Sequence, residues 1–139
     1  MRYMMIVKAS RASESGVMPT EAQFAEMGAY NEQLAEAGVL IDLSGLKPTS
    51  KGAKICFSGG RRTLIEGPFV EDSNIVAGFW IIQVKSHQEA VDWAMKAPNP
   101  AFNDTEGEIE LRPFYEPEDF ASSAALDKAM ELEFPGKRS

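Results

Sequence analysis

The apolar run at residues 75–82 constrains the fold more than any other feature of this chain. It lies within a longer segment, residues 75–85, whose middle is apolar on both faces when it is read as a β-strand. A strand of that kind lies inside a sheet that is covered on both sides. The run has eight residues, whereas a membrane-spanning helix needs about 20. We therefore predict a central strand here and no association with a membrane.

The other segments alternate between helix and strand patterns. Two predicted helices begin at capping residues, with Thr20 three positions before Gln23 and Ser86 three positions before Glu89. The pair Gly59-Gly60, which lies between two strand-like segments, predicts a hairpin with a two-residue turn. The predicted helices are 20–37, 86–97 and a C-terminal helix at 117–134, and the predicted strands are 3–9, 39–46, 53–58, 61–66, 75–85 and 108–114.

This order of elements predicts the α+β class. It corresponds to a ferredoxin-like split βαβ arrangement with an inserted hairpin, followed by a C-terminal helix. We assign residues 1–120 to one domain and residues 121–139 to a C-terminal helical extension. Two helices cover only one face of the sheet, and an exposed apolar second face would promote aggregation. We therefore expect a homodimer in which two copies pack sheet on sheet around a central cleft.

Charge and residue counts exclude several classes of function. The 139 residues include 14 Lys and Arg against 21 Asp and Glu, a net charge of −7, which disfavours binding to nucleic acid or to anionic membranes. Cys56 and His87 are the only residues of their types, so one chain holds no disulfide and no multi-cysteine or two-histidine metal site. We predict no cofactor and, without a signal segment, a cytoplasmic location. Cys56 is expected to pack as a small apolar residue.

Several short blocks in a fixed order resemble the YCII-related family, and in particular its branch named for an Asp-Gly-Pro-Phe (DGPF) motif. The resemblance runs from residue 3 to about residue 120 and implies a dimeric α+β barrel. It implies no settled activity, since relatives are proposed to be small enzymes or ligand-binding accessory proteins, some associated with sigma-type transcription factors. The blocks are residues 37–40, 45–48, 66–71, 77–80, 90–94 with Pro98, and 109–114.

The sequence departs from the family pattern in three places. Glu66 replaces the Asp of the motif, and the segment after Phe69 lacks the lysine that usually follows. The better-known branch has a His in the first helix and an Asp before a Pro, but here that helix has no His and Ala97 precedes Pro98. The His–Asp pair of that branch is therefore not carried over to this chain.

Six residues are candidates for a site in the cleft. Glu66 and Glu71 flank a Gly-Pro turn, and carboxylates beside a low-dielectric cleft can act as general acid or base. In the alternative interpretation, the turn is structural, Phe69 fills the core and both acids are solvated. The candidate ligand-binding residues are Asp42, Phe69, Glu110 and Arg112.

Arg112 lies two positions from Glu110 on one strand, so the two share a face. Its guanidinium could hold an anionic ligand, or it could pair with an acid such as Asp42 or Glu66. One cation among several acids favours a polar or amine-bearing ligand.

Two functions follow from these residues, and both stay open. The first is a protein that binds a small molecule in the dimer cleft, with a cofactor-free acid–base step carried by Glu66 or Glu71 and clamped by Arg112. The second is a non-catalytic regulatory or accessory module that acts through its dimer surface and C-terminal helix.

Overall fold

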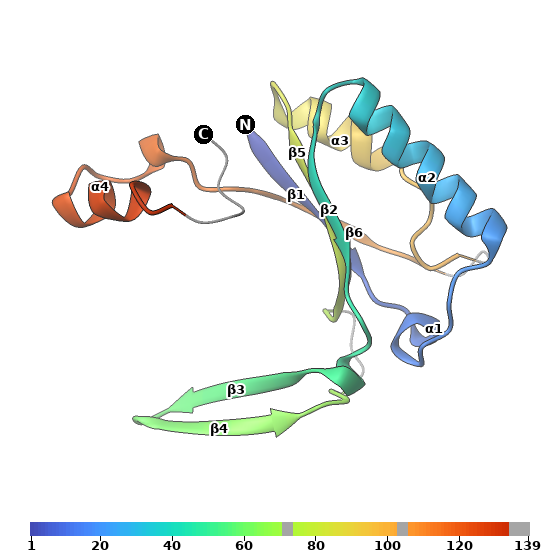
Figure 1. Cartoon of the computed structure of the whole chain (residues 1–139), viewed down its shortest axis with the longest axis horizontal. Helices are drawn as coiled ribbons and strands as arrows, with labels where there is room; N and C mark the ends of the chain where they lie inside the picture. The colour runs from blue at the N-terminus through green and yellow to red at the C-terminus, as the bar shows by residue number, and fades with distance from the viewer. Residues whose placement is uncertain (71–73, 103–105, 134–139) are drawn as a thin grey trace.

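The computed structural model describes residues 1–70, 74–102 and 106–133, and it confirms the mixed α+β class (Figure 1). Four antiparallel strands form the main sheet in the order β2-β5-β1-β6, and β3 and β4 form a separate two-stranded sheet. The strands are β1 (Arg2–Lys8), β2 (Leu40–Gly45), β3 (Ala53–Ser58), β4 (Arg61–Glu66), β5 (Val76–Gln83) and β6 (Ile109–Pro113).

The core lies between the main sheet and two helices on one of its faces, α2 (Glu21–Glu36) and α3 (His87–Met95) (Figure 1). Each helix begins directly after its predicted capping residue. The side chain of Thr20 accepts a hydrogen bond from the amide of Gln23, and the side chain of Ser86 accepts one from the amide of Glu89. The buried core residues are Tyr3, Met5, Tyr30, Leu34, Val39, Trp80, Ile82, Val84 and Ala90.

Two hydrogen bonds join these layers at buried aromatic side chains. The hydroxyl of Tyr30 donates to the carbonyl oxygen of Trp93 at 2.6 Å, which joins α2 to α3. The indole Nε1 of Trp80 donates to Oδ1 of Asn31 at 2.7 Å, which joins β5 to α2. Burial of a polar group is costly unless it is paired, so these bonds fix how the helices lie on the sheet.

The opposite face of the sheet carries two rows of side chains set by the strand register. Residues directly opposite one another in antiparallel strands point to the same side. One row is Asp42, Ile81, Met4 and Arg112, and the other is Ser44, Phe79, Ile6 and Glu110. The centre of each row is apolar and half-buried, and no helix of the described residues covers it (Figure 1). We call this surface the open face.

The predicted hairpin is confirmed, with the strand bounds expected from its turn. Gly59 and Gly60 have φ of 53° and 80°, a conformation that two consecutive glycines adopt readily. The hairpin leaves the sheet on the side opposite α2 and α3 (Figure 1), and both of its strands are exposed along their length. Phe57 is 66% exposed and Leu64 is 58% exposed. We call residues 53–66 the hairpin arm.

The prediction of one C-terminal helix over residues 117–134 is wrong. The structure has a short 3-10 helix, η2 (Pro117–Asp119), and a separate helix, α4 (Ala124–Met130). The backbone of Phe120 is extended, with φ −108° and ψ 147°, and Ser123 begins the second helix by capping the amide of Leu126. Residues 10–19, which lie between the first predicted strand and the first predicted helix, also hold a short helix, α1 (Arg11–Glu14), which Ser10 caps. Among the described residues, no helix is both long and apolar enough to cross a membrane.

Candidate functional site

The base of the hairpin arm is fixed by a hydrogen-bond network centred on Thr49, in the 3-10 helix η1 (Thr49–Lys51). Its amide and its hydroxyl both donate to the carboxylate of Glu14, at 3.0 Å and 2.5 Å. The same hydroxyl oxygen accepts a hydrogen bond from the amide of Phe69 at 3.1 Å. The amide of Gly67 donates to the carbonyl oxygen of Gly52 at 2.9 Å. This network ties both ends of the arm to the N-terminal part of the chain.

Gly67 makes close backbone packing possible at the same point. A Cβ atom on this residue would overlap the carbonyl group of Thr49, so no larger residue fits without a backbone shift. The peptide bond between Gly67 and Pro68 is cis. The turn that the sequence predicted before Phe69 is therefore built against η1, and it aims the Phe69 ring at the space beside the arm.

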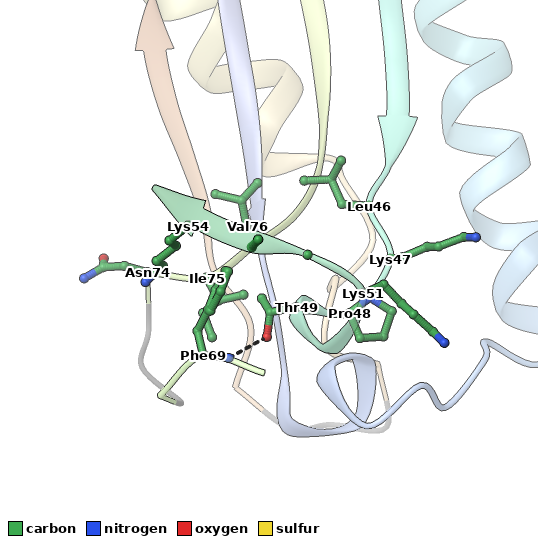
Figure 2. Close-up of a pocket in the computed structure, with 12 residues that line it drawn as sticks. Leu46, Lys47, Pro48, Thr49, Lys51, Lys54, Phe69, Asn74, Ile75 and Val76 are labelled. Atoms are coloured by element: carbon green, nitrogen blue, oxygen red, sulfur yellow. Dashed lines mark hydrogen bonds between the residues drawn. The ribbon is translucent and has the colours of Figure 1, made fainter. Parts of the chain in front are cut away.

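A cavity of about 520 Å³ lies at this position, between the arm and the adjacent end of the sheet (Figure 2). Its volume is in the range of small-molecule sites. Figure 2 shows apolar side chains from three segments around it, with Phe69 beside Ile75. The lining residues are Leu46, Lys47, Pro48, Thr49, Lys51, Gly52, Ala53, Lys54, Phe69, Asn74, Ile75 and Val76.

The charged side chains among the described lining residues are lysines. The ammonium of Lys54 lies 4.3 Å from the centre of the Phe69 ring, a cation–π distance. Figure 2 shows the ammonium groups of Lys47 and Lys51 pointing away from Phe69. Lys54 is therefore the cation placed to contact a ligand beside Phe69, while the other two raise the local positive potential.

A second charged group lies on the open face near β6. The ammonium of Lys8 is 2.9 Å from Glu110 Oε1, and the guanidinium of Arg112 is 3.3 Å from Glu110 Oε2. The Lys8 side chain is only 9% exposed, and Glu110 is its ion-pair partner. The hydrogen bond from Lys8, followed by that from Arg112, holds the pKa of Glu110 below its ordinary value. Glu110 is therefore a carboxylate at neutral pH and does not carry a proton.

Among the described residues, Glu110 and Arg112 are the predicted site residues that pair, and Asp42 and Glu66 do not join them. Asp42 lies on the edge strand β2, and β5 and β1 separate it from Arg112 on the opposite edge strand. Its carboxylate accepts a hydrogen bond from the amide of Leu43 at 2.8 Å. Glu66 is the exposed last residue of β4, and Glu71 lies outside the described residues. Among the described residues, Arg112 pairs with Glu110, whereas one of the two sequence interpretations named Asp42 or Glu66 as examples of its acid partner.

Three residues of the cavity region were missed by the sequence interpretation: Glu14, Thr49 and Lys54. The spacing of lysines at positions 47, 51 and 54 in an acidic chain was a usable signal for a local positive charge. The pairing of Glu14 with Thr49 left no comparable signal, because it joins residues 35 positions apart. Cys56 was expected to be packed, and that expectation is wrong because the residue is exposed on the arm.

A second cavity, of about 450 Å³, lies on the other side of the sheet between α2 and the strands β2 and β5. Phe24, Gly28 and Asn31 of α2 line it, together with Leu43 and Trp80. Its position follows from the packing of α2, because Tyr30 and Leu34 are buried whereas Phe24, near the start of the helix, is 53% exposed. The described residues contain no group of three or more His, Cys, Asp or Glu side chains able to hold a metal ion.

Comparison with known proteins identifies the class of protein. The family model of the YCII-related domain matches residues 1–116, so the chain belongs to the YCII-related family. It is also similar to the uncharacterized protein R00369 of Rhizobium meliloti (strain 1021), with 32% identity over 99 residues, 70% of this chain and 78% of that protein. The family expected from the sequence is confirmed, and its DGPF branch is a finer assignment that the match leaves as a proposal.

Proposed function

We propose that this chain is a homodimeric small-molecule-binding protein of the DGPF branch of its family. The main sheet supports a ferredoxin-like protomer, because its strand order without the hairpin arm places the first and third strands at the centre. The open face supports the dimer, because its apolar centre is half-buried and has no cover in the described part of one chain. A second copy packed sheet on sheet would cover it.

The ligand site that the geometry favours is the cavity at the base of the hairpin arm. The observation that carries this proposal is Lys54 beside Phe69, at the edge of a cavity with apolar walls. An aromatic ring fits against Phe69, Ile75 and Val76, and an anionic group fits the ammonium of Lys54. The ligand class is therefore a small aromatic or apolar carboxylate. This differs from the amine-bearing ligand expected from the sequence, which rested on acids that do not line this cavity.

An acid–base step remains part of the proposal at Glu66 and Glu71. Glu110 is unsuited to it, because Lys8 and Arg112 keep its carboxyl ionised. Glu66 lies at the base of the arm, at the start of the turn that carries Phe69. We assign Arg112 and Asp42 to the dimer cleft, where the open faces of two copies would bring further residues to them.

Titration with benzoate and benzamide tests the proposed ligand class. The two molecules have similar shapes, but only benzoate carries a charge at neutral pH. We expect benzoate to shift the amide resonances of residues 49, 54 and 69 in a saturable way, and benzamide to bind at least about tenfold more weakly because it lacks the ion pair. Equal binding of both molecules, or shifts confined to the cavity under α2, would contradict the assignment.

Two variants locate the charge that binds benzoate. Lys54→Met keeps a flexible apolar side chain but removes the ammonium beside Phe69, and we expect it to abolish the preference for benzoate over benzamide. Lys47→Met removes the same charge from a side chain that points away from Phe69 (Figure 2), and it should retain most of that preference. The same loss in both variants would show that only the general positive potential matters.

A regulatory or accessory role is a second candidate, and the exposed apolar side chains of the hairpin arm favour it. Exposed apolar patches on small domains often mark contacts with other proteins. If no benzoate-like carboxylate binds while the arm still mediates association, this second function is the better account.

A further inference from the structure

The charges of this acidic chain are separated between two segments. Residues 47–66 hold five of the 14 Lys and Arg residues and a single acid, Glu66. Residues 116–133 hold six acids and a single cation, Lys128. We call the second segment the acidic tail. The tip of the hairpin arm carries Arg61 and Arg62, whereas the lysines lie at its base beside the cavity.

Both segments extend from the sheet to the same side, opposite α2 and α3, but from its two ends (Figure 1). Each also exposes apolar side chains. On the arm, Ile55, Phe57 and Leu64 share one face by the strand register and are all exposed. On the tail, Phe120, Met130 and Leu132 are exposed. The arm thus combines an apolar surface with positive charge, and the tail combines an apolar surface with negative charge.

We propose that the hairpin arm of one copy clasps the acidic tail of a second copy. The proposal rests on the homodimer proposed above and adds which surfaces meet and how the two copies are oriented. Complementary charge across an interface favours one orientation over others, and like charges brought together oppose it. The apolar side chains of arm and tail supply the contact area, and the charges select the pairing.

The geometry of a two-fold dimer makes this a choice between two arrangements. A two-fold axis that runs across the strands exchanges the ends of the sheet, so each arm meets the other copy's tail. An axis that runs along the strands instead sets arm against arm and tail against tail, which brings like charges together. That second arrangement would also place the β2 edge, with Asp42, against the β6 edge, with Arg112. The attraction between Asp42 and Arg112 in that arrangement would be small, because Arg112 already pairs with Glu110.

Charge-reversal variants test the orientation directly. One variant is Arg61→Glu with Arg62→Glu, and the other is Glu118→Lys with Glu131→Lys. If the clasp is correct, each variant alone removes most of the charge attraction from both clasps, because it leaves the arm with a net charge of 0 or the tail with −1. It also sets like charges against each other at the substituted positions, and it weakens self-association at low salt by at least about tenfold. Their equimolar mixture forms heterodimers, because one clasp then keeps the original opposite charges and the other sets the substituted arm tip against the oppositely charged substituted positions of the tail. A chain with all four substitutions recovers its own dimer for the same reason.

Controls separate this proposal from the dimer on which it rests. Lys85→Glu with Lys96→Glu makes the same change in charge as the arm variant on two exposed residues near α3, and it should leave the dimer unchanged. If the unmodified chain is monomeric at its highest soluble concentration, the proposed dimer is wrong. If the unmodified chain is a dimer but both reversed variants dimerise as well as it does, the clasp is wrong and the dimer stands.

Disulfide trapping gives a readout that does not depend on stability. Cys56 is the single cysteine, so Cys56→Ser gives a background into which pairs can be introduced. In that background the clasp predicts covalent dimers when Ser58→Cys is combined with Glu131→Cys. It predicts few when Ser58→Cys is present alone. Efficient covalent dimers from Ser58→Cys alone would show arm against arm and overturn the proposal.

Discussion

The carboxylate of Glu14 accepts two hydrogen bonds from Thr49, one from the Thr49 amide at 3.0 Å and one from the Thr49 hydroxyl at 2.5 Å. Through the same hydroxyl, Thr49 accepts a hydrogen bond from the amide of Phe69. The last residue of the short helix α1 thus determines where the turn at the base of the hairpin arm lies. The cavity beside Phe69 depends on this chain of contacts, since Thr49 and Phe69 both line it.

Replacing Thr49 tests whether this chain of contacts stabilises the base of the arm. Thr49→Val removes the hydroxyl that serves both Glu14 and Phe69, and we expect a loss of about 1.5–3 kcal/mol in the local free energy of unfolding. Thr49→Ser keeps the hydroxyl and is the matched control. Hydrogen exchange at the amides of Gly67 and Phe69 measures the effect. Equal protection in both variants would show that the hydroxyl contributes nothing.

Two glycines should respond to alanine in opposite directions. Gly67→Ala places a Cβ against the backbone carbonyl of Thr49, and we expect a loss of about 1–3 kcal/mol in stability. Gly28 is inside α2 with nothing within 4 Å of an added Cβ. Gly28→Ala should therefore stabilise the protein by roughly 0.5–1 kcal/mol through helix propensity. Denaturant unfolding of both variants checks the signs, and destabilisation by Gly28→Ala would mean that the cavity under α2 requires a glycine.

The pKa of Glu110 should respond more to Lys8 than to Arg112, because the hydrogen bond from Lys8 is the largest cause of its lowering. We expect Lys8→Met to raise this pKa toward the ordinary value and Arg112→Met to raise it less. The lowered pKa stabilises the fold above the pKa of the unfolded chain, and this contribution is lost as pH falls through the folded value. Carboxyl carbon NMR titration measures the pKa of Glu110 in the unmodified chain and in the two variants. A larger change with Arg112→Met would reverse the assignment.

Tyr30 should resist ionisation in the folded protein. Burial raises the pKa of its phenol to about 12 from 10.0. Because the pKa of Tyr30 is higher in the folded than in the unfolded chain, its neutral phenol contributes fully to folding stability below pH 10. That contribution is lost between pH 10 and about pH 12. Tyr30→Phe removes the bond to the Trp93 carbonyl and should cost about 1 kcal/mol. Absorbance titration of tyrosinate, compared with Tyr30→Phe, isolates this group, and ionisation near pH 10 would contradict its burial.

Local signals predicted most of the fold. The two hairpin strands have the bounds that were predicted, because Gly59 and Gly60 determine the turn and a strand of equal length lies on each side of it. The helix caps at Thr20 and Ser86 were also found, since a cap involves residues three positions apart. The C-terminal segment was predicted incorrectly as one helix over residues 117–134. Ser123 instead starts a separate helix after the extended backbone of Phe120.

The candidate site was less predictable because its residues meet through tertiary contacts. Phe69 was among the predicted candidates and lines the cavity, but the cavity itself was not foreseen. The two edges of the sheet separate Asp42 from Glu110 and Arg112, and a strand pattern alone does not reveal strand order. Lys54 acquires its role only through its position over the Phe69 ring.

Native mass spectrometry of the purified, unmodified chain tests the central claim most directly. The claim is that a second copy covers the open face, which lies on the side of the sheet from which the hairpin arm and the acidic tail extend (Figure 1). The predicted result is a species with the mass of two chains that persists on dilution to low micromolar concentration. A species with the mass of one chain at every concentration would contradict it, because the open face would then have no partner of its own kind.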